Sequence, residues 1–317
     1  MCLKTNMANV TDGDSVGLIV ARCLICSVGI IANALVIVVM IYNKIFRKSI
    51  TNTLLLHQSI LDFLGCCLFL AFYNNDAPSG DGAKIFCKAR VMFWYISAAS
   101  TYNLVMLTIE RYLAVAHPLM YRKRQIYRKR LIPLSIPHLC GFLSSLQLGI
   151  FADEDKEYPG ECMYDYHGDS ARVFSGILLF TTYWLIPVCI MGYCYICILL
   201  GLRRRKNVGL RRDSSNTDSK PTRLNKQERN LLYTLVVVCI AFLITVTPNF
   251  VLYLIYAICN CFAFSKVSIH EVTVLMNTSN LCINPFIYCF NFKEFQREVV
   301  KIKNNVFQKN HIFTTKE

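Results

Sequence analysis

The chain has 317 residues, of which 54% are hydrophobic and only 17% are charged, and its formal net charge is +14. A soluble globular protein has about a quarter of its residues charged. The apolar residues of this chain are gathered into long runs, which excludes an ordinary soluble domain. Its positive charge lies in the loops between those runs, so we expect no nucleic-acid partner.

Seven runs are long enough to cross a membrane, since a helix of about 20 apolar residues spans the hydrocarbon core of a bilayer. We predict transmembrane helices over residues 23–42, 50–73, 91–109, 131–151, 173–202, 231–259 and 272–290. A transmembrane barrel would instead need short segments of alternating polarity. We therefore expect an all-α membrane protein whose seven-helix domain covers 18–290, after an N-terminal segment, 1–17, and before a tail, 291–317.

The segment before the first run is polar, so we expect no cleavable signal peptide. It contains the sequon Asn9-Val10-Thr11, which makes Asn9 a candidate glycosylation site. The tail begins with Phe292, Phe295, Val299 and Val300 separated by cations, a spacing that predicts an amphipathic eighth helix on the inner leaflet.

The distribution of basic residues predicts the orientation. Lysine and arginine follow the first, third and fifth runs and the seventh, whereas the loop from Asp153 to Asp169 is acidic. Basic loops stay in the cytoplasm and suit the anionic lipids of that leaflet. We predict a multi-pass plasma-membrane protein with its N-terminus outside the cell and its C-terminus inside.

Most of the sixteen cysteines lie within the runs, where a thiol behaves as a small apolar group. On the outer side, Cys87 precedes the third run and Cys162 lies in the acidic loop. A disulfide between them would hold that loop over the mouth of the bundle, and the extracellular compartment permits it. Cys259 and Cys261 could pair with each other or with Cys2, but we expect free thiols at the membrane interface.

Polar side chains at membrane depth are costly and are candidates for function. The second run contains Asp62, and Asn33, Ser100, Asn280 and Asn284 lie in other runs. Together they predict an oxygen-lined pocket for a small cation or a proton, although a hydrogen-bond network that only joins helices would use the same residues.

Prolines mark bends, because proline removes a backbone hydrogen bond from a helix. Pro187, Pro248 and Pro285 lie deep within the last three runs. Three bent helices around a polar core predict a bundle that can hinge.

In this order, the motifs resemble those of the rhodopsin-like, class A G-protein-coupled receptors. They are "GIIANALVI" with Asn33, "TNTLLLHQSILDF" with Asp62, "ERYLAVAHPL" after the third run, Pro187 with Tyr195, Pro248, and "NPFIY" followed by Phe295. The resemblance covers residues 17–303 and implies a receptor that activates heterotrimeric G proteins.

The resemblance also implies roles for individual residues. Arg111 would be the central switch residue, restrained at rest by its neighbour Glu110 and by Glu228, and released when helix 6 moves away from helix 3. The other expected switch and coupling residues are Tyr112, Tyr195, Asn284, Pro285 and Tyr288. Asp62, Ser100, Asn280 and Asn284 would form an allosteric sodium site.

Two departures from the family pattern stand out. The helix 6 segment that usually reads Cys-Trp-x-Pro is Thr245-Val246-Thr247-Pro248, so the aromatic toggle is missing. Helix 4 lacks its usual tryptophan and contains Pro133 and Pro137 instead.

The outer half of the runs offers aromatic and polar groups for a ligand, although ordinary packing uses such groups too. The candidates are Phe93, Trp94, Ser97, Tyr183, Asn249, Phe250, Tyr253, His270 and Glu271. The acidic loop above them would attract a cation, so we favour a neuropeptide-like or other basic peptide, with a lipid or another small molecule as the alternative.

Other protein classes fit less well. A transporter or channel would also place polar groups at mid-membrane, but no internal repeat is visible and the Glu-Arg-Tyr motif would lack a role. The six histidines show no metal-binding spacing, so we expect neither an enzyme nor a cofactor beyond the sodium ion.

Overall fold

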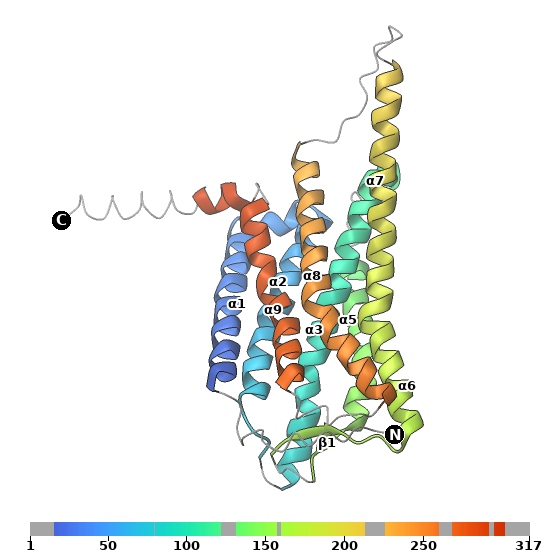
Figure 1. The fold of residues 1–317 in the computed structure, drawn as a ribbon. Coiled ribbons are helices and arrows are strands. Elements are labelled where there is room, and N and C mark those ends of the chain that lie inside the picture. The colour runs from blue at the N-terminus through green and yellow to red at the C-terminus, as the bar shows by residue number, and fades with distance from the viewer. Residues whose placement is uncertain are drawn as a thin grey trace, which may run out of the picture.

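The computed structural model describes residues 16–78, 80–121, 131–156, 160–212, 226–259, 268–291 and 295–301, and these form an elongated bundle of helices (Figure 1). The long helices are α1 (Val16–Tyr42), α2 (Ile50–Tyr73), α3 (Asp81–Ala116), α5 (Leu131–Phe151), α6 (Asp169–Leu179) continuing through the π-helix η2 (Phe180–Leu185) into α7 (Ile186–Arg212), α8 (Lys226–Cys259) and α9 (Ser268–Asn291). A 3-10 turn, η1 (Ile45–Arg47), joins α1 to α2. The seven predicted helices are therefore present in the predicted order.

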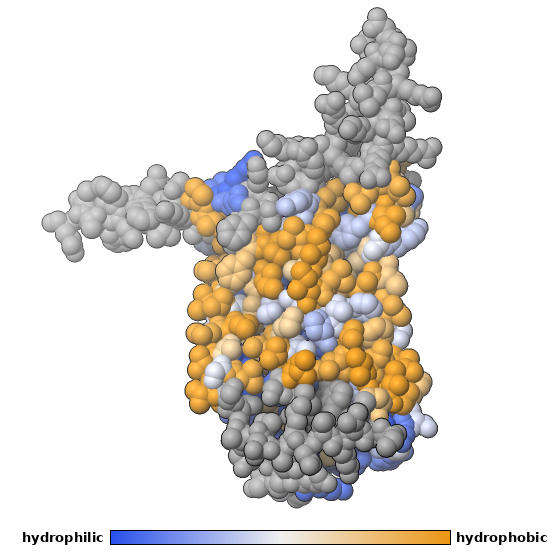
Figure 2. Space-filling view, viewed as in Figure 1, coloured by the Kyte–Doolittle hydropathy of each residue, from blue (hydrophilic) through white to orange (hydrophobic). Residues whose placement is uncertain are grey.

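The helices have the apolar character of membrane spans. Five of those described, α1, α2, α5, the continuous helix that starts with α6, and α8, are long and apolar enough to cross a bilayer. Apolar residues dominate the middle of the visible face, with hydrophilic residues gathered toward the ends (Figure 2). The two remaining helices, α3 and α9, are less apolar because they carry many of the buried polar side chains of the core.

A helix begins at the residue predicted from hydropathy where a capping residue stands at the start of the apolar run. The helix α2 begins at Ile50 as predicted, since the hydroxyl of Ser49 accepts a hydrogen bond from the Asn52 amide at 3.1 Å. Helix α3 is longer than its apolar run, because helical hydrogen bonds continue beyond the apolar region.

A short β-hairpin covers one end of the bundle, which we call the hairpin end. Its strands, β1 (Ala152–Glu154) and β2 (Cys162–Tyr164), are antiparallel, with Glu154 opposite Cys162. The predicted disulfide between Cys87 and Cys162 is confirmed, with 5.4 Å between the two Cα atoms, and it ties β2 to α3. Cys259 is also disulfide-bonded, so the expectation of a free thiol at Cys259 is wrong.

The three prolines lie within helices, at the positions that the sequence predicted. Pro248 lies inside α8 and Pro285 inside α9. Pro187 is the second residue after the π-helical segment, whose wider turn is closed by a bond from the Ile186 amide to the Thr181 carbonyl. Near the opposite end of the bundle, residues 295–301 form a short helix whose Phe295 is buried in the main core.

Close contact between α3 and α5 depends on a glycine. A Cβ atom at Gly141 would lie 2.9 Å from the backbone nitrogen of Ala99, which has no freedom to move aside. A Cβ atom at Gly149, on the same helix, would meet nothing within 4 Å. The α5 surface around Gly141 is therefore shaped for direct backbone contact.

Replacing Gly141 by alanine should lower the melting temperature of the purified protein, because overpacking costs about 1–3 kcal/mol. Replacing Gly149 by alanine should leave it unchanged or raise it, since alanine favours a helix by about 1 kcal/mol over glycine. Thermal unfolding of the two variants in one detergent tests this, and equal melting temperatures would contradict the packing argument.

Candidate functional site

The candidate residues fall into three zones along the bundle axis: a polar network in the middle, a charged cluster at the hairpin end, and the Arg111 region at the opposite end. Asn9 and the side chains of Glu228 and Tyr288 lie outside the part of the chain that the structure describes.

The middle zone is built around Asp62, which is fully buried on α2. Its Oδ1 atom accepts hydrogen bonds from the Ser100 hydroxyl at 2.6 Å and the Gln58 amide at 2.9 Å. Its Oδ2 atom accepts one from the Asn284 amide at 2.8 Å. Asp62, Ser100 and Asn284 thus meet as predicted, and they join α2, α3 and α9.

The orientation of the Gln58 amide follows from its neighbours. Asn103 uses its amide nitrogen to donate to the Leu54 carbonyl at 3.0 Å and to Gln58 Oε1 at 2.8 Å. Gln58 must therefore turn its own nitrogen toward Asp62, and that nitrogen also contacts the Ser100 hydroxyl. Sequence analysis did not single out Gln58, although it lies one helical turn before Asp62.

This arrangement does not fit the predicted sodium ion. The Gln58 nitrogen donates to Asp62 Oδ1 and contacts the Ser100 hydroxyl, and these are two oxygens that a sodium ion would bridge. Its N–H groups point at those oxygens and repel a cation. Asn280, the fourth predicted ligand, accepts a hydrogen bond from Thr245 at 3.4 Å instead.

Sodium should therefore have little effect on the melting temperature of the wild-type protein, compared with choline chloride at equal concentration. Gln58→Leu should create a sodium-dependent increase of about 2 °C or more, because a leucine leaves the two oxygens free for the ion. The double variant with Asp62→Asn should lose that increase. A sodium-stabilised wild type would show that Gln58 does not exclude the ion.

Two histidines, His57 on α2 and His138 on α5, extend the network to α5. His57 Nδ1 lies 2.9 Å from Asn103 Oδ1, and His57 Nε2 lies 2.9 Å from His138 Nε2. Because the Asn103 oxygen can only accept, His57 carries its proton on Nδ1 and accepts at Nε2 from His138. The Tyr95 hydroxyl then donates to His138 Nδ1 at 2.8 Å.

Neither histidine was predicted from the sequence. Their contact depends on how α5 packs against α2, which the sequence of either helix alone does not show. The result is a directed chain of hydrogen bonds from Tyr95 to Asp62.

At the Arg111 end, Arg111 and its neighbour Glu110 are both buried. Arg111 is 7% exposed, and its Nη2 atom donates to the Tyr121 hydroxyl at 3.3 Å. Glu110 is fully buried. Tyr112 and Tyr195 pack against one small cluster at this end, and the Tyr195 hydroxyl accepts from the Cys239 thiol at 3.5 Å. Tyr121 was missed by sequence analysis.

The predicted ligand residues gather toward the hairpin end, chiefly as an aromatic cluster. Ring centroids are 5.2 Å apart between Phe93 and Trp94, 6.4 Å between Trp94 and Phe250, and 5.1 Å between Phe250 and Tyr183. Phe93 and Tyr183 are 0% and 1% exposed, so these two form packed core.

Three polar residues among the predicted ligand contacts form hydrogen bonds with side chains of other residues. Asn249 accepts from the Thr273 hydroxyl at 3.3 Å, and the hydroxyls of Tyr253 and Tyr166 are hydrogen-bonded. Ser97, 7% exposed, accepts from Thr101 through its carbonyl at 3.1 Å.

An aromatic side chain also contacts the segment of α8 from Thr245 to Pro248, where the family pattern has a tryptophan and this chain does not. Trp184, in η2, donates from its indole nitrogen to the Thr247 hydroxyl at 2.8 Å, next to Pro248. A tryptophan on the neighbouring helix therefore contacts the bend of α8. The family pattern, which places the tryptophan on α8 itself, does not predict this contact from the neighbouring helix.

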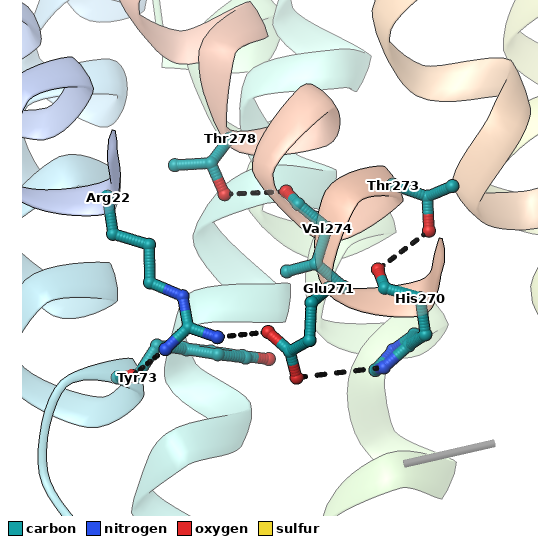
Figure 3. Close-up of polar contacts among 7 residues, drawn as sticks. All are labelled: Arg22, Tyr73, His270, Glu271, Thr273, Val274 and Thr278. Atoms are coloured by element: carbon teal, nitrogen blue, oxygen red, sulfur yellow. Dashed lines mark hydrogen bonds and ion pairs between the residues drawn. The ribbon is translucent and has the colours of Figure 1, made fainter. Parts of the chain in front are cut away.

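The charged cluster lies at the hairpin end, where α1, α2 and α9 meet (Figure 3). Arg22 of α1 is 3% exposed, forms an ion pair with Glu271 of α9 and donates to the Tyr73 carbonyl at 2.8 Å. His270 turns its Nδ1 atom toward Glu271, 4.0 Å from Oε1. The guanidinium of Arg90, on α3, lies over the ring of Tyr73, 4.0 Å from its centroid.

Glu271 and His270 were predicted to contact a ligand, but the two arginines were not. Arg22 directly precedes the first predicted run and looked like its boundary. Only the packing of α1 against α9 places it beside Glu271.

The hairpin adds acidic groups above this cluster. The Asp153 carboxylate accepts from the Glu154 amide at 2.9 Å and pairs with Lys84 at 3.1 Å. The backbone bond to Glu154 and the charge of Lys84 hold the pKa of Asp153 below its ordinary value. Asp153 therefore stays ionised at neutral pH.

A helix bundle with a buried polar axis, a disulfide-tethered hairpin at one end and a buried arginine at the other has the architecture of a membrane receptor. Residues 32–288 match the family described as "7 transmembrane receptor (rhodopsin family)". The chain belongs to this family, which is the class A G-protein-coupled receptors and consists of signalling receptors, not enzymes.

Similar proteins include receptors for peptides. The chain is 28% identical to somatostatin receptor type 4 of Rattus norvegicus over 311 residues, covering 92% of this chain and 75% of the relative. It is 27% identical to C-C chemokine receptor type 8 of Macaca mulatta over 315 residues, covering 95% and 82%. It is 24% identical to the G-protein coupled receptor homolog Q2/3L of sheeppox virus (strain KS-1) over 302 residues, covering 92% and 74%.

Proposed function

We propose that this receptor lies in the plasma membrane with its hairpin end outside the cell, binds an extracellular peptide that carries basic residues, and activates heterotrimeric G proteins. The observation that carries the proposal is the buried Arg111 at the end opposite the hairpin. An activating ligand would favour the state in which α8 separates from α3, by its difference in affinity for the two states.

The peptide class is supported by two observations. Relatives include proteins named as somatostatin, C-C chemokine and neuropeptide Y receptors. In addition, the hairpin end presents carboxylates, among them Asp153, Glu154 and Asp155 on the hairpin, which would attract a cationic peptide and speed its arrival.

The path from ligand to switch would run through the polar axis. Trp184 contacts the bend of α8 at Thr247, and Asn284 links α9 to Asp62. A change at the hairpin end that moves α8 or α9 would therefore alter hydrogen bonds in the middle of the bundle.

The test is nucleotide exchange on purified heterotrimeric G proteins by the receptor in lipid nanodiscs. Pools of basic peptides should accelerate exchange, and Arg111→Ala should abolish the acceleration without preventing peptide binding. Solute or ion flux through receptor-containing vesicles, with no exchange on any G protein class, would refute the proposal and favour a transporter.

A further inference from the structure

We propose that Trp184 is a positioning residue that holds the bend of α8, through a hydrogen bond to Thr247 that ties this bend to α3 by way of the π-helix η2. The inference rests on the proposed function, because it takes separation of α8 from α3 as the activating movement. It adds to that function the contact that holds the two helices in their resting arrangement at the level of Pro248.

The bend of α8 is a weak place in its backbone. Pro248 has no N–H group, so the carbonyl of Ile244, four residues earlier, cannot receive the usual helical hydrogen bond. The residue directly before the proline is Thr247, and its hydroxyl oxygen accepts from the indole nitrogen of Trp184 at 2.8 Å. A side chain of another helix is thus bonded to α8 where its own backbone is least constrained.

Side-chain hydrogen bonds flank Pro248 toward two neighbouring elements, α9 and η2. Those to α9 are long, at 3.4 and 3.3 Å, and join Thr245 to Asn280 and Thr273 to Asn249. The bond from Trp184 to Thr247, at 2.8 Å, is within the range of well-formed N–H···O bonds. We therefore expect the η2 contact to constrain the bend more strongly than the α9 contacts do.

A side chain of α3 anchors η2. The amide of Ile186 bonds to the carbonyl of Thr181, five residues earlier. In that pattern the next bond would run from Pro187 to the carbonyl of Thr182, but proline has no N–H group to donate. The Thr182 carbonyl accepts from the hydroxyl of Tyr102 on α3 at 2.7 Å. The wide turn of η2 is thus fixed to α3 at the carbonyl that proline cannot serve.

Three consecutive residues of η2 therefore connect α3 to α8. The carbonyl of Thr182 and the hydroxyl of Tyr183 are both bonded to α3, the hydroxyl donating to the Trp94 carbonyl at 3.3 Å. Trp184 is bonded to α8, and the Tyr183 ring packs against Phe250 of α8 with 5.1 Å between ring centroids. Since η2 is anchored on α3, the bond from Trp184 opposes any change in the bend of α8 relative to α3.

The distance between α3 and α8 at the end opposite the hairpin tests this tie. Spin labels are attached to a non-natural amino acid at Ala116 of α3 and at Tyr233 of α8, which are both exposed near that end. The distance between the labels is measured by pulsed electron resonance on the purified full-length receptor in lipid nanodiscs. Thr247→Val removes the hydroxyl at nearly constant shape. It should increase the population with the longer distance about two- to tenfold, as expected for the loss of one hydrogen bond.

Matched variants separate the hydrogen bond from general packing. Trp184→Phe should give the same increase, and the double variant with Thr247→Val should give no more, because all three lack the same bond. Thr247→Ser keeps a hydroxyl and should resemble the wild type. The control is Thr182→Val, which removes a hydroxyl that bonds to the Leu178 carbonyl of its own helix at 2.8 Å, and it should leave the distances unchanged.

Trp184 also supplies an optical signal, since the chain contains two tryptophans. In a Trp94→Phe background the tryptophan emission comes from Trp184 alone. Trp184 packs against the main hydrophobic core, and an indole in apolar surroundings emits at shorter wavelength when its N–H group loses a hydrogen bond. Thr247→Val should therefore shift this emission to shorter wavelength, whereas Thr182→Val should not change it.

Unchanged distances or unchanged emission in a folded Thr247→Val variant would overturn the tie, as would effects of Thr247→Val and Trp184→Phe that add in the double variant. The comparison of Thr247→Val with Thr247→Ser decides the matter even where Trp184→Phe does not fold. Nucleotide exchange is measured on the same wild-type preparation. Its absence with every G protein class would refute the proposed function, while the distances alone decide whether Trp184 positions α8.

Discussion

Cys87→Ser should remove most of the receptor from the cell surface. The Cys87–Cys162 disulfide closes a loop with a sequence separation of 75 residues, and chain entropy assigns to such a link about 4–5 kcal/mol. Its loss would free β2 from α3, together with Tyr164 and the small cluster of Ala77, Ala83 and Cys87 beneath the hairpin. Most folded proteins are stable by about 5–15 kcal/mol, so the effect is large.

Surface and total amounts of an N-terminally tagged receptor measure this effect in intact cells. The matched control is Cys189→Ser, since Cys189 is exposed on α7 and free, and it should reach the surface normally. Normal surface delivery of Cys87→Ser, or mass spectrometry that finds free thiols at Cys87 and Cys162 in the wild type, would contradict the expectation.

Glu228→Ala should raise basal nucleotide exchange about two- to fivefold, as expected from the loss of a pair worth about 0.5–1 kcal/mol. Arg111 is buried on α3, and its Nε atom makes no hydrogen bond within the described part of the chain. Glu228 belongs to α8, and the family resemblance implies that its carboxylate restrains Arg111 at rest. Removing it would favour separation of α8 from α3.

Basal nucleotide exchange of the wild type and of each variant is compared at equal surface expression. The double variant with Arg111→Ala should show no increase, because the released arginine would then be missing. Lys226→Ala, two residues earlier on the same helix, should behave as the wild type. Basal exchange that does not change in Glu228→Ala would exclude the restraining pair.

Much of the fold could be predicted because the relevant information is local. A run of apolar residues specifies a membrane helix whatever its neighbours are, and α2 and α5 have the predicted bounds, Ile50–Tyr73 and Leu131–Phe151. The disulfide could be predicted from the compartment and from which cysteines lie outside the runs. Bounds failed where helices continue past the apolar region, as α3 does.

The candidate site could be predicted only in part. Asp62, Ser100 and Asn284 were expected together, because polar groups in a membrane must find partners. The role of Gln58 could not be foreseen, because the direction of its amide depends on Asn103 of another helix. The ion pair between Arg22 and Glu271 joins residues that are 249 positions apart, and no local pattern relates them.

The sequence by itself determined that this protein is a seven-helix membrane receptor, which of its ends is acidic and which is basic, and that Asp62 lies within a membrane span. Only the tertiary structure decided which side chains meet. Contacts such as Trp184 with Thr247 and His57 with His138 depend on how each helix is rotated and shifted against the next. Packing at close contacts, such as Gly141 against Ala99, sets that placement. The order of residues along one helix does not specify which residues of another helix it will contact.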